Sequence, residues 1–343
     1  MLNIRELWHA EDGGQYTNRR IPGMIVTDRG TLIIYNEARR AASDWAMMDI
    51  FCQRSVDNGA SFEAPIYLAN GTEEHPTVNN PVMVQDRNGR IHFLYCEDYG
   101  VDGGRILRRY SDDDGVSWSK PIDLTEATLP QLRNAFALGP GHGIRLQNGV
   151  LVIPIWMVPK RYHAPLHSHF PSEITTLYST DDGEHWHLGD ILTSNSEIFS
   201  PNETVAAELS DGRVYLSIRH RAHQRVKAIS RDGYSQWEDY APDYALIDPM
   251  CFGSIAAYAK EGVPHTLFFA NCEHMSSRTH VVIKASMDDG ATFPYRVMLD
   301  EENGGYVEIA VDVSRDRIYV LYEHKYGESL HLATMNYRDL IPE

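Results

Sequence analysis

The sequence predicts an all-β protein, a six-bladed β-propeller with four antiparallel strands in each blade. One observation is a turn motif, Ser-x-Asp-x-Gly-x-x-aromatic, whose regular copies begin at Ser55, Ser111, Ser179 and Ser286, with a degenerate copy at Ser230. The copies recur about every 58 residues on average, so the 343-residue chain holds nearly six units. The other observation is the series of short strand-like segments between the copies, which is typical of propeller blades.

The repeated motif has the chemistry of a tight turn. Serine and aspartate side chains bind nearby backbone N–H groups, glycine adopts a positive φ, and the aromatic ring covers the hairpin that the turn closes. In the degenerate copy, Tyr234 stands where the glycine is expected. We therefore interpret the motif as part of the scaffold and not as a catalytic element.

Each unit contains short segments rich in β-branched and aromatic residues, separated by turn residues. In the first unit, strands are expected at 23–27, 31–37 and 49–55, and the motif leads into an outer strand. The corresponding segments of the other units are 81–85, 90–98 and 106–111; 142–146, 150–158 and 174–179; 204–209, 213–219 and 226–230; 254–259, 265–272 and 280–286; and 307–312, 318–323 and 330–335.

The two ends of the chain are expected to complete one blade together. The last unit ends near Met335 without a motif or an outer strand, and the chain begins with a spare strand-like segment, Ile4 to Trp8. Pairing of this segment with residues 330–335 would close the ring and cover an exposed sheet edge. We expect one domain over residues 1–343, because no linker or low-complexity segment interrupts the pattern.

The composition narrows the classes of partner. The 31 Lys and Arg residues against 48 Asp and Glu residues give a net charge of −17, which disfavours nucleic acid and anionic membrane surfaces. Arg5 and Glu6 interrupt the start of the chain, and no later segment approaches eighteen uninterrupted apolar residues, so we expect a cytoplasmic protein without a secretion signal. The four cysteines are widely spaced, which favours buried thiols over disulfides or a zinc site.

The blade topology brings polar residues from several units to one face. Entries into the first strand and connections between the second and third strands lie on the face opposite the Asp motifs. Cationic, acidic and aromatic residues from four blades are therefore expected at one mouth of the propeller: Arg20, Arg39, Asp44, Glu203, Arg219, Arg278 and Tyr306.

At these positions the sequence resembles the exo-sialidase (neuraminidase) family of glycoside hydrolases with Asp-box (BNR) repeats. The resemblance covers nearly the whole chain, and its individually weak matches occur in the family's order. They are Arg20-Ile21-Pro22, Glu37-Ala38-Arg39, Asn202-Glu203 followed by ELSDGRVYLSIR ending at Arg219, Arg278 before the last Asp motif, and Tyr306 ahead of Leu321 to Glu323.

The resemblance implies a retaining exo-glycosidase that hydrolyses terminal sialic acid, or a related 2-keto-3-deoxy sugar acid, from a sialylated oligosaccharide or glycoconjugate. It assigns the carboxylate of the substrate to Arg20, Arg219 and Arg278, with Arg39 as a fourth contact. Arginine suits this role because its planar guanidinium donates two parallel hydrogen bonds to a carboxylate, whereas lysine offers a point charge.

The resemblance also implies which groups perform the reaction. The carboxylate of the substrate would repel a carboxylate nucleophile, and sialidases use a tyrosine instead, here Tyr306 with Glu203 as the base. Asp44 matches the general acid. Asp49 is a competing choice for the acid, although it opens a strand and is expected to face a structural partner. Glu308 is the rival of Glu203, because it lies on the same side of its strand as Tyr306.

Other interpretations accompany this prediction. An inactive propeller that binds sialylated glycans or a partner protein would keep the arginines and lose the nucleophile or the acid, whereas Tyr306, Glu203 and Asp44 are all present. In a third interpretation, the protein has the same fold but transfers the sugar acid to another sugar, or acts on a different sugar acid such as Kdo.

A histidine-rich insertion, with histidines at positions 163, 167 and 169, lies in the third unit. It contains prolines, lacks a partner cysteine and has no ordered helical spacing, so a metal site there is disfavoured. We expect this loop, residues 160–171, to arch over the mouth and shape substrate specificity. We expect no metal ion and no cofactor.

Overall fold

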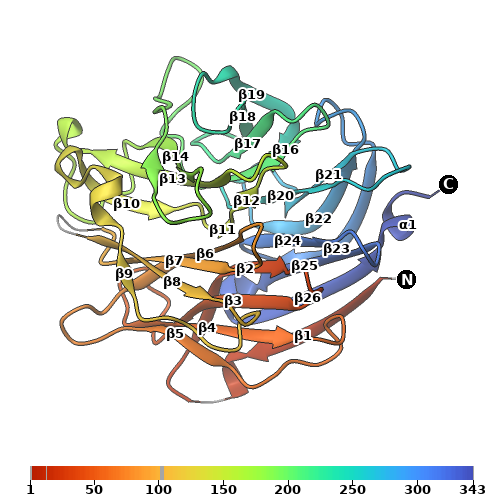
Figure 1. Ribbon diagram of the computed structural model, residues 1–343, viewed down its shortest axis with the longest axis horizontal. Helices are drawn as coiled ribbons and strands as arrows, with labels where there is room; N and C mark the ends of the chain where they lie inside the picture. Colours follow the sequence, from red (N-terminus) through yellow and green to blue (C-terminus); the bar gives the residue numbers. More distant parts are fainter. Residues whose placement is uncertain (1, 13, 101–103, 343) are drawn as a thin grey trace.

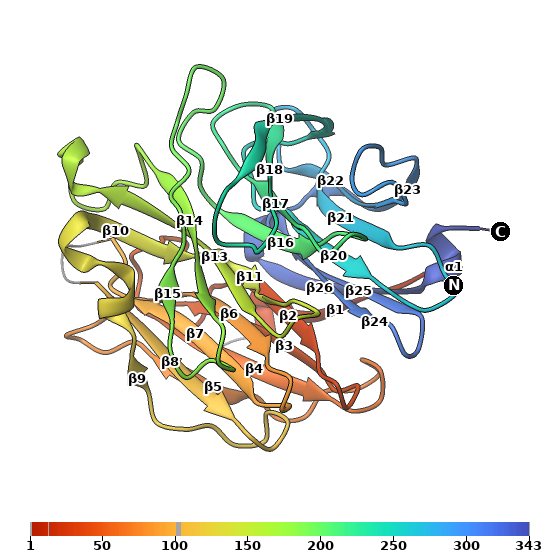
Figure 2. The same cartoon turned by 45° about the horizontal axis from the view of Figure 1, so that its top comes forward.

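The computed structural model describes residues 2–12, 14–100 and 104–342. Its strands form six sheets around a central axis, and both termini lie at the same blade (Figures 1 and 2). The predicted all-β, six-bladed propeller is confirmed. The innermost strands of neighbouring blades contact one another around the axis.

Four blades have the predicted order of four antiparallel strands from the axis outward. Blade one consists of β2 (Asn18–Val26), β3 (Leu32–Arg39), β4 (Met48–Ser55) and β5 (Ile66–Asn70). The others are β6 (Val78–Gln85), β7 (Ile91–Glu97), β8 (Arg105–Ser111) and β9 (Ile122–Asp123) in blade two; β16 (Thr204–Glu208), β17 (Val214–Ile218), β18 (Gln224–Ser230) and β19 (Glu238–Ile247) in blade four; and β20 (Ser254–Tyr258), β21 (Thr266–Cys272), β22 (Thr279–Ser286) and β23 (Tyr295–Asn303) in blade five.

Blade three differs from the prediction at its innermost strand. Two separate strands, β10 (Arg133–Leu138) and β12 (Ile144–Arg145), pair with β13 (Leu151–Pro159), which pairs with β14 (Glu173–Ser179) and then β15 (His187–Leu188). Between them, β11 (Gly141–His142) leaves the blade and pairs in parallel with β6. Gly141 has a φ of 91°, and a Cβ atom there would lie 2.4 Å from a Glu308 carboxylate oxygen, so only glycine fits this detour.

Blade six is closed by the two ends of the chain. It contains β24 (Val307–Asp312), β25 (Arg317–His324), β26 (Ser329–Asn336) and, as its outer strand, β1 (Asn3–His9). Ile4 pairs with Ala333 and Trp8 with Leu330 in antiparallel register, which confirms the predicted closure. A single-turn helix, α1 (Tyr337–Leu340), follows β26.

The turn motifs form the hydrogen bonds that their residue types predict. In the copy at Ser55, the serine hydroxyl oxygen accepts a bond of 2.8 Å from the backbone N–H of Gly59, whose φ is 80°. In the degenerate copy, the positive-φ glycine was expected at the position of Tyr234. The structure shows that Gly233, one position earlier, adopts the positive φ of 82°. Its N–H donates to the Ser230 hydroxyl at 3.1 Å, so this turn is one residue tighter.

Apolar side chains between neighbouring sheets form the core. One large cluster joins blades two, three and four through residues such as Leu94, Ile153 and Leu216, and another joins blades five and six through Phe268 and Val320. Short 3-10 helices lie in the connections: η1 (Ala10–Asp12), η2 (Thr125–Thr128), η3 (Pro130–Leu132), η4 (Lys160–Tyr162) and η5 (Lys325–Gly327). Within the described ranges, no helix has the length and apolar character needed to span a membrane.

Candidate active site

A cavity of about 420 Å³ opens on the predicted mouth of the propeller. Its walls come from all six blades, and every residue that the sequence analysis placed at the mouth lines it. These residues are Arg20, Arg39, Asp44, Glu203, Arg219, Arg278 and Tyr306. The fold therefore brings the predicted set together at one site.

The hydroxyl of Tyr306 and the carboxylate of Glu203 are in direct contact at the cavity floor. The phenol donates a hydrogen bond to Oε1 of Glu203. Arg219 Nη1 donates to both groups, at 2.5 Å to Oε2 of Glu203 and at 3.1 Å to the phenolic oxygen. A guanidinium thus lies against the acid and the phenol at the same time.

Backbone hydrogen bonds that continue the strand pairing beyond the strand ends position the side chains of Glu203, Arg219 and Tyr306. The N–H of Arg219 donates to the carbonyl of Glu203 at 2.9 Å, which extends the β16–β17 pairing by one residue. In blade six, the N–H of Glu323 donates to the carbonyl of Tyr306 at 2.9 Å. Tyr306 is 6% exposed and Glu203 also 6%, so both side chains are largely shielded from solvent.

The surroundings of Tyr306 hold its proton in place in the resting protein. Burial raises the pKa of the phenol well above its usual value, and the nearby Glu203 carboxylate raises it further. The cations Arg219, Arg278 and Arg20 act in the opposite direction. The guanidinium carbons of Arg20 and Arg278 lie 5.1 and 5.6 Å from the centroid of the Tyr306 ring.

Arg20 is fixed by a buried acid of the neighbouring blade six. It donates two hydrogen bonds to the Glu323 carboxylate, from Nε at 3.1 Å and from Nη2 at 3.2 Å. A bulge in β2 follows Arg20, with Ile21 at a φ of 54°, and the Ile21 N–H also donates to Glu323. The remaining Nη1 of Arg20 lies 3.8 Å from Oδ1 of Asp44.

Arg278 differs from the other three arginines of the predicted set in its pairing. Arg20, Arg39 and Arg219 each form an ion pair with a carboxylate of this chain. Over the described ranges, Arg278 forms no such pair. Its charge is therefore available to an anionic ligand in the cavity.

Asp44 lies on the connection after β3, with its side chain 40% exposed. Arg39 Nη1 donates to Oδ1 of Asp44 at 2.5 Å, and its Nε and Nη2 donate to the buried Glu37 at 2.8 and 2.6 Å. Burial alone would raise the pKa of the Asp44 carboxyl, but the charge and the hydrogen bond of Arg39 lower it below its ordinary value.

The two rival carboxylates lie outside this cavity. Asp49 is buried in β4, where it accepts hydrogen bonds from the Tyr16 hydroxyl at 2.5 Å and the Gly71 N–H at 3.1 Å. Glu308 is also fully buried, and its carboxylate contacts the His142 ring. Both have structural partners, as was expected for Asp49.

One histidine of the blade-three insertion reaches the cavity. His169 and Phe170 line its wall, and Nε2 of His169 lies 3.0 Å from the Tyr99 hydroxyl. The His167 ring packs edge-on against Trp45 with 4.1 Å between centroids. In the described part of the chain, these histidines are not among the groups whose donor atoms converge as metal ligands would.

The structure adds residues that the sequence analysis did not identify. Tyr99 and Trp156 line the cavity, and the buried indole N–H of Trp156 has no hydrogen-bond partner within the described residues. Aromatic residues in strands are ordinary core residues, so no local signal marked them. Glu323 ends the Leu-Tyr-Glu segment of the family resemblance, but its contact with Arg20 depends on the closed ring.

The family of the chain follows from its match to a family model. Residues 66–330 match the model described as the BNR repeat-like domain. The chain belongs to the BNR repeat-like domain family. Proteins that are similar to it in sequence include sialidases, which confirms the resemblance to the exo-sialidase family and agrees with the prediction of a glycoside hydrolase.

Two relatives represent the curated proteins that are similar in sequence. A sialidase from Bacteroides fragilis is 26% identical over 337 residues, which cover 89% of this chain and 59% of the relative. Sialidase-3 from Homo sapiens is 28% identical over 328 residues, which cover 87% of this chain and 72% of the relative. This chain thus spans somewhat more than half of the length of the Bacteroides protein.

Solved structures of similar fold also include sialidases. Hadza microbial sialidase Hz136 superposes with a TM-score of 0.86 at 24% identity, over 98% of this chain and 69% of that chain. The intramolecular trans-sialidase from Ruminococcus gnavus superposes with a TM-score of 0.79 at 14% identity, over 98% of both chains. At these identities the likeness concerns the propeller fold alone.

Proposed function

We propose that the protein is a retaining exo-α-sialidase that releases terminal sialic acid, or a related 2-keto-3-deoxy sugar acid, from a glycan. The observation that carries the proposal is the hydrogen-bonded pair of Tyr306 and Glu203 beneath the arginines of the cavity. A family whose curated relatives include sialidases supports the same function. The substrate would be a sialylated oligosaccharide or glycoconjugate.

Arg20, Arg219 and Arg278 would bind the carboxylate of the sugar acid. Arg20 is held by Glu323 through Nε and Nη2, so its Nη1 remains for the substrate. Arg278 adds a charge that no carboxylate of the described chain takes up. Arg39 would make a fourth contact from the side of Asp44. Planar guanidinium groups suit a carboxylate that must be held in one orientation.

In the first step, the Tyr306 oxygen would attack the anomeric carbon while Glu203 takes the phenolic proton. The bond from the anomeric carbon to the leaving oxygen breaks, and Asp44 in its protonated form donates a proton to that oxygen. Because Arg39 lowers the pKa of Asp44, acidic pH favours this form. Arg219 would stabilise the negative charge that develops on the phenolic oxygen, which it contacts at 3.1 Å. The product of this step is a sugar joined covalently to Tyr306.

In the second step, water would attack the anomeric carbon from the side that the leaving group vacated. Asp44, now a carboxylate, takes a proton from the water, and Glu203 returns its proton to the departing Tyr306 oxygen. Two inversions at one carbon give net retention of configuration. The side chains of the resting protein are then restored.

The test is hydrolysis of a fluorogenic α-sialoside by the full chain, beside matched Kdn and Kdo glycosides, with the first product followed by proton NMR. We expect release from the sialoside, with the α-anomer formed before mutarotation. A β-anomer as first product would exclude the tyrosine intermediate. Binding of sialosides without release of any of the three sugars would favour the glycan-binding propeller instead.

A further inference from the structure

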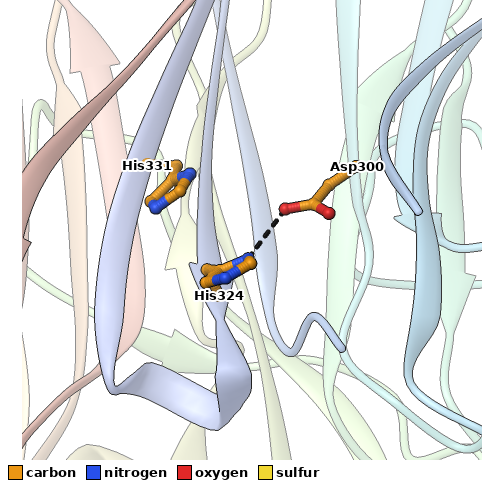
Figure 3. A group of neighbouring side chains, drawn as sticks. All are labelled: Asp300, His324 and His331. Atoms are coloured by element: carbon orange, nitrogen blue, oxygen red, sulfur yellow. Dashed lines mark hydrogen bonds and ion pairs between the residues drawn. The ribbon is translucent and has the colours of Figure 1, made fainter. Parts of the chain in front are cut away.

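A second group of polar side chains lies outside the cavity, at the seam between blades five and six. Asp300 comes from β23, His324 ends β25 and His331 lies in β26. Figure 3 shows His324 between the other two, with its ring nitrogen facing the Asp300 carboxylate. One donor atom from each residue lies within 4.8 Å of the other two.

The three side chains are held close together and away from solvent. His324 Nδ1 is 2.8 Å from Oδ2 of Asp300 (Figure 3), and the two imidazole rings are nearly parallel with 4.6 Å between their centroids. The side chains of Asp300, His324 and His331 are 12%, 14% and 18% exposed. Two imidazoles and a carboxylate are typical donors for zinc.

Two further carboxylates face the outer nitrogens of the imidazole rings. Oε2 of Glu302 is 3.6 Å from Nε2 of His324, and Oε2 of Glu6 is 3.4 Å from Nε2 of His331. Histidines that bind a metal through one nitrogen commonly donate the N–H of the other to a carboxylate. Nδ1 of His324 then faces Asp300, and Nδ1 of His331 lies 3.5 Å from the Tyr322 hydroxyl, a long contact that an ion would replace.

The described chain has a second cluster of this kind, formed by His75, Glu97 and Asp98. It differs from the group at the seam because an arginine already binds one of its carboxylates. In that cluster, His75 is 37% exposed, and Glu97 is paired with Arg105. Over the described ranges, no lysine or arginine forms an ion pair with Asp300, Glu302 or Glu6. The carboxylates at the seam are therefore paired with imidazoles and not with lysine or arginine.

We propose that Asp300, His324 and His331 form a binding site for a divalent transition metal of the zinc class, separate from the catalytic cavity. The fourth position would be taken by water, since zinc sites with three protein ligands keep one open. Zinc–nitrogen bonds are about 2.0–2.1 Å long, so binding would draw the donors together and turn His331 out of the parallel stack.

The position of the site gives the ion a structural role. It joins the outer strand of blade five to two strands of blade six, with Glu6 of the closing strand β1 beside it. Glu323, which holds Arg20, directly precedes His324. An ion that binds only the folded chain stabilises it in proportion to the logarithm of the ion concentration. Zinc would therefore strengthen the seam between blades five and six.

The test uses the full chain, stripped with a chelator and then titrated with Zn²⁺ by calorimetry and with Co²⁺ by visible absorption. We expect saturable binding of one equivalent at the seam, a Co²⁺ spectrum of a low-coordinate nitrogen and oxygen site, and a Tm that rises with zinc concentration. His331→Gln and Asp300→Asn should each weaken zinc binding at least about tenfold.

His75→Gln is the matched control and should bind zinc as the unchanged protein does. Circular dichroism of the metal-free variants checks their folding, and Asp300→Asn, which preserves shape, decides the outcome where His331→Gln unfolds. The proposal is overturned if the stripped protein binds no equivalent of zinc, or if the folded Asp300→Asn variant keeps the affinity of the unchanged protein.

Discussion

The hydroxyl of Tyr306 donates a hydrogen bond to the carboxylate of Glu203, although 103 residues separate them along the chain. Arg219 contacts both groups and links the phenolic oxygen to the acid. Burial raises the pKa of Tyr306 well above its usual value, so the phenol keeps its proton until a substrate arrives. Glu203 is already in contact with that proton and is placed to accept it.

Tyr306→Phe should lower kcat on a fluorogenic sialoside by about three orders of magnitude or more, because the attacking oxygen is removed. Binding of a sialic-acid-like inhibitor should change only a few-fold, since the arginines that hold the carboxylate remain. Steady-state kinetics and calorimetry measure the two effects. Tyr244→Phe, at a side chain that is 78% exposed, is the matched control. Retention of most activity by Tyr306→Phe would exclude it as the nucleophile.

Asp44→Asn should separate substrates by their leaving groups. We expect a loss of about 10²- to 10⁴-fold in kcat on natural sialosides, which need a proton on the departing oxygen. Aryl sialosides with good leaving groups should lose far less. Comparison of kcat for the two substrate classes is the measurement.

Asp49→Asn is the control for the acid. It should leave the leaving-group dependence unchanged and lower the Tm, because it weakens the acceptor of the Tyr16 and Gly71 bonds. Equal losses on both substrate classes in Asp44→Asn would reassign Asp44 to substrate positioning. A selective loss in Asp49→Asn would make Asp49 the acid.

The Asp motifs should make stability depend on pH in the acid range. Hydrogen bonds from Ser61 hold the pKa of Asp57 at about 2, and those from Ser117 outweigh burial to hold the pKa of Asp113 at about 2. The pKa of an aspartate in the unfolded chain is about 3.9. Because the folded pKa values are lower, this stabilisation is present above about pH 4 and is lost as the pH falls toward 2.

Urea midpoints measured between pH 5 and pH 2 test this dependence. In a variant with Asp57→Asn, Asp113→Asn and Asp181→Asn, the midpoint should fall less steeply with decreasing pH, although the variant is less stable at pH 5. The Asp181 carboxyl belongs to the same class, with a pKa of about 2. A variant with the same slope as the unchanged protein would contradict the assignment of the slope to these turns.

Deletion of residues 1–9 should destabilise the fold by several kcal/mol. It removes the β1–β26 ladder, and each backbone hydrogen bond contributes about 0.5–1.5 kcal/mol net. The deletion also exposes β26 as an unpaired edge, which favours aggregation. Urea unfolding and the monomer fraction measure both effects, with Val56→Ala in an exposed turn as the control. An unchanged urea midpoint would mean that β1 does not contribute to closure.

The repeated units could be predicted because each depends on local chemistry. Strand segments, tight turns and the motif at Ser55 are encoded by neighbouring residues, and their repetition predicts a propeller. The blade topology then places Arg20, Glu203 and Tyr306 at one mouth without further information. The detour of β11 was missed, because it depends on Gly141 lying against Glu308, which is distant in sequence.

The sequence by itself determined the number of blades, the closing strand and the residues at the mouth, because periodic patterns and strand ends are local properties. The assignment of Glu203 as the base of Tyr306 already implied that these two side chains touch, and the structure confirms it. Only the tertiary structure decided the other contacts of the site. Glu323 and Arg20 are 303 residues apart, and they meet because closure of the ring brings blades one and six together. Packing of the consecutive blades five and six brings His324 and His331 beside Asp300, a grouping without any sequence spacing to predict it. Packing between blades, and not the pattern within them, sets these contacts.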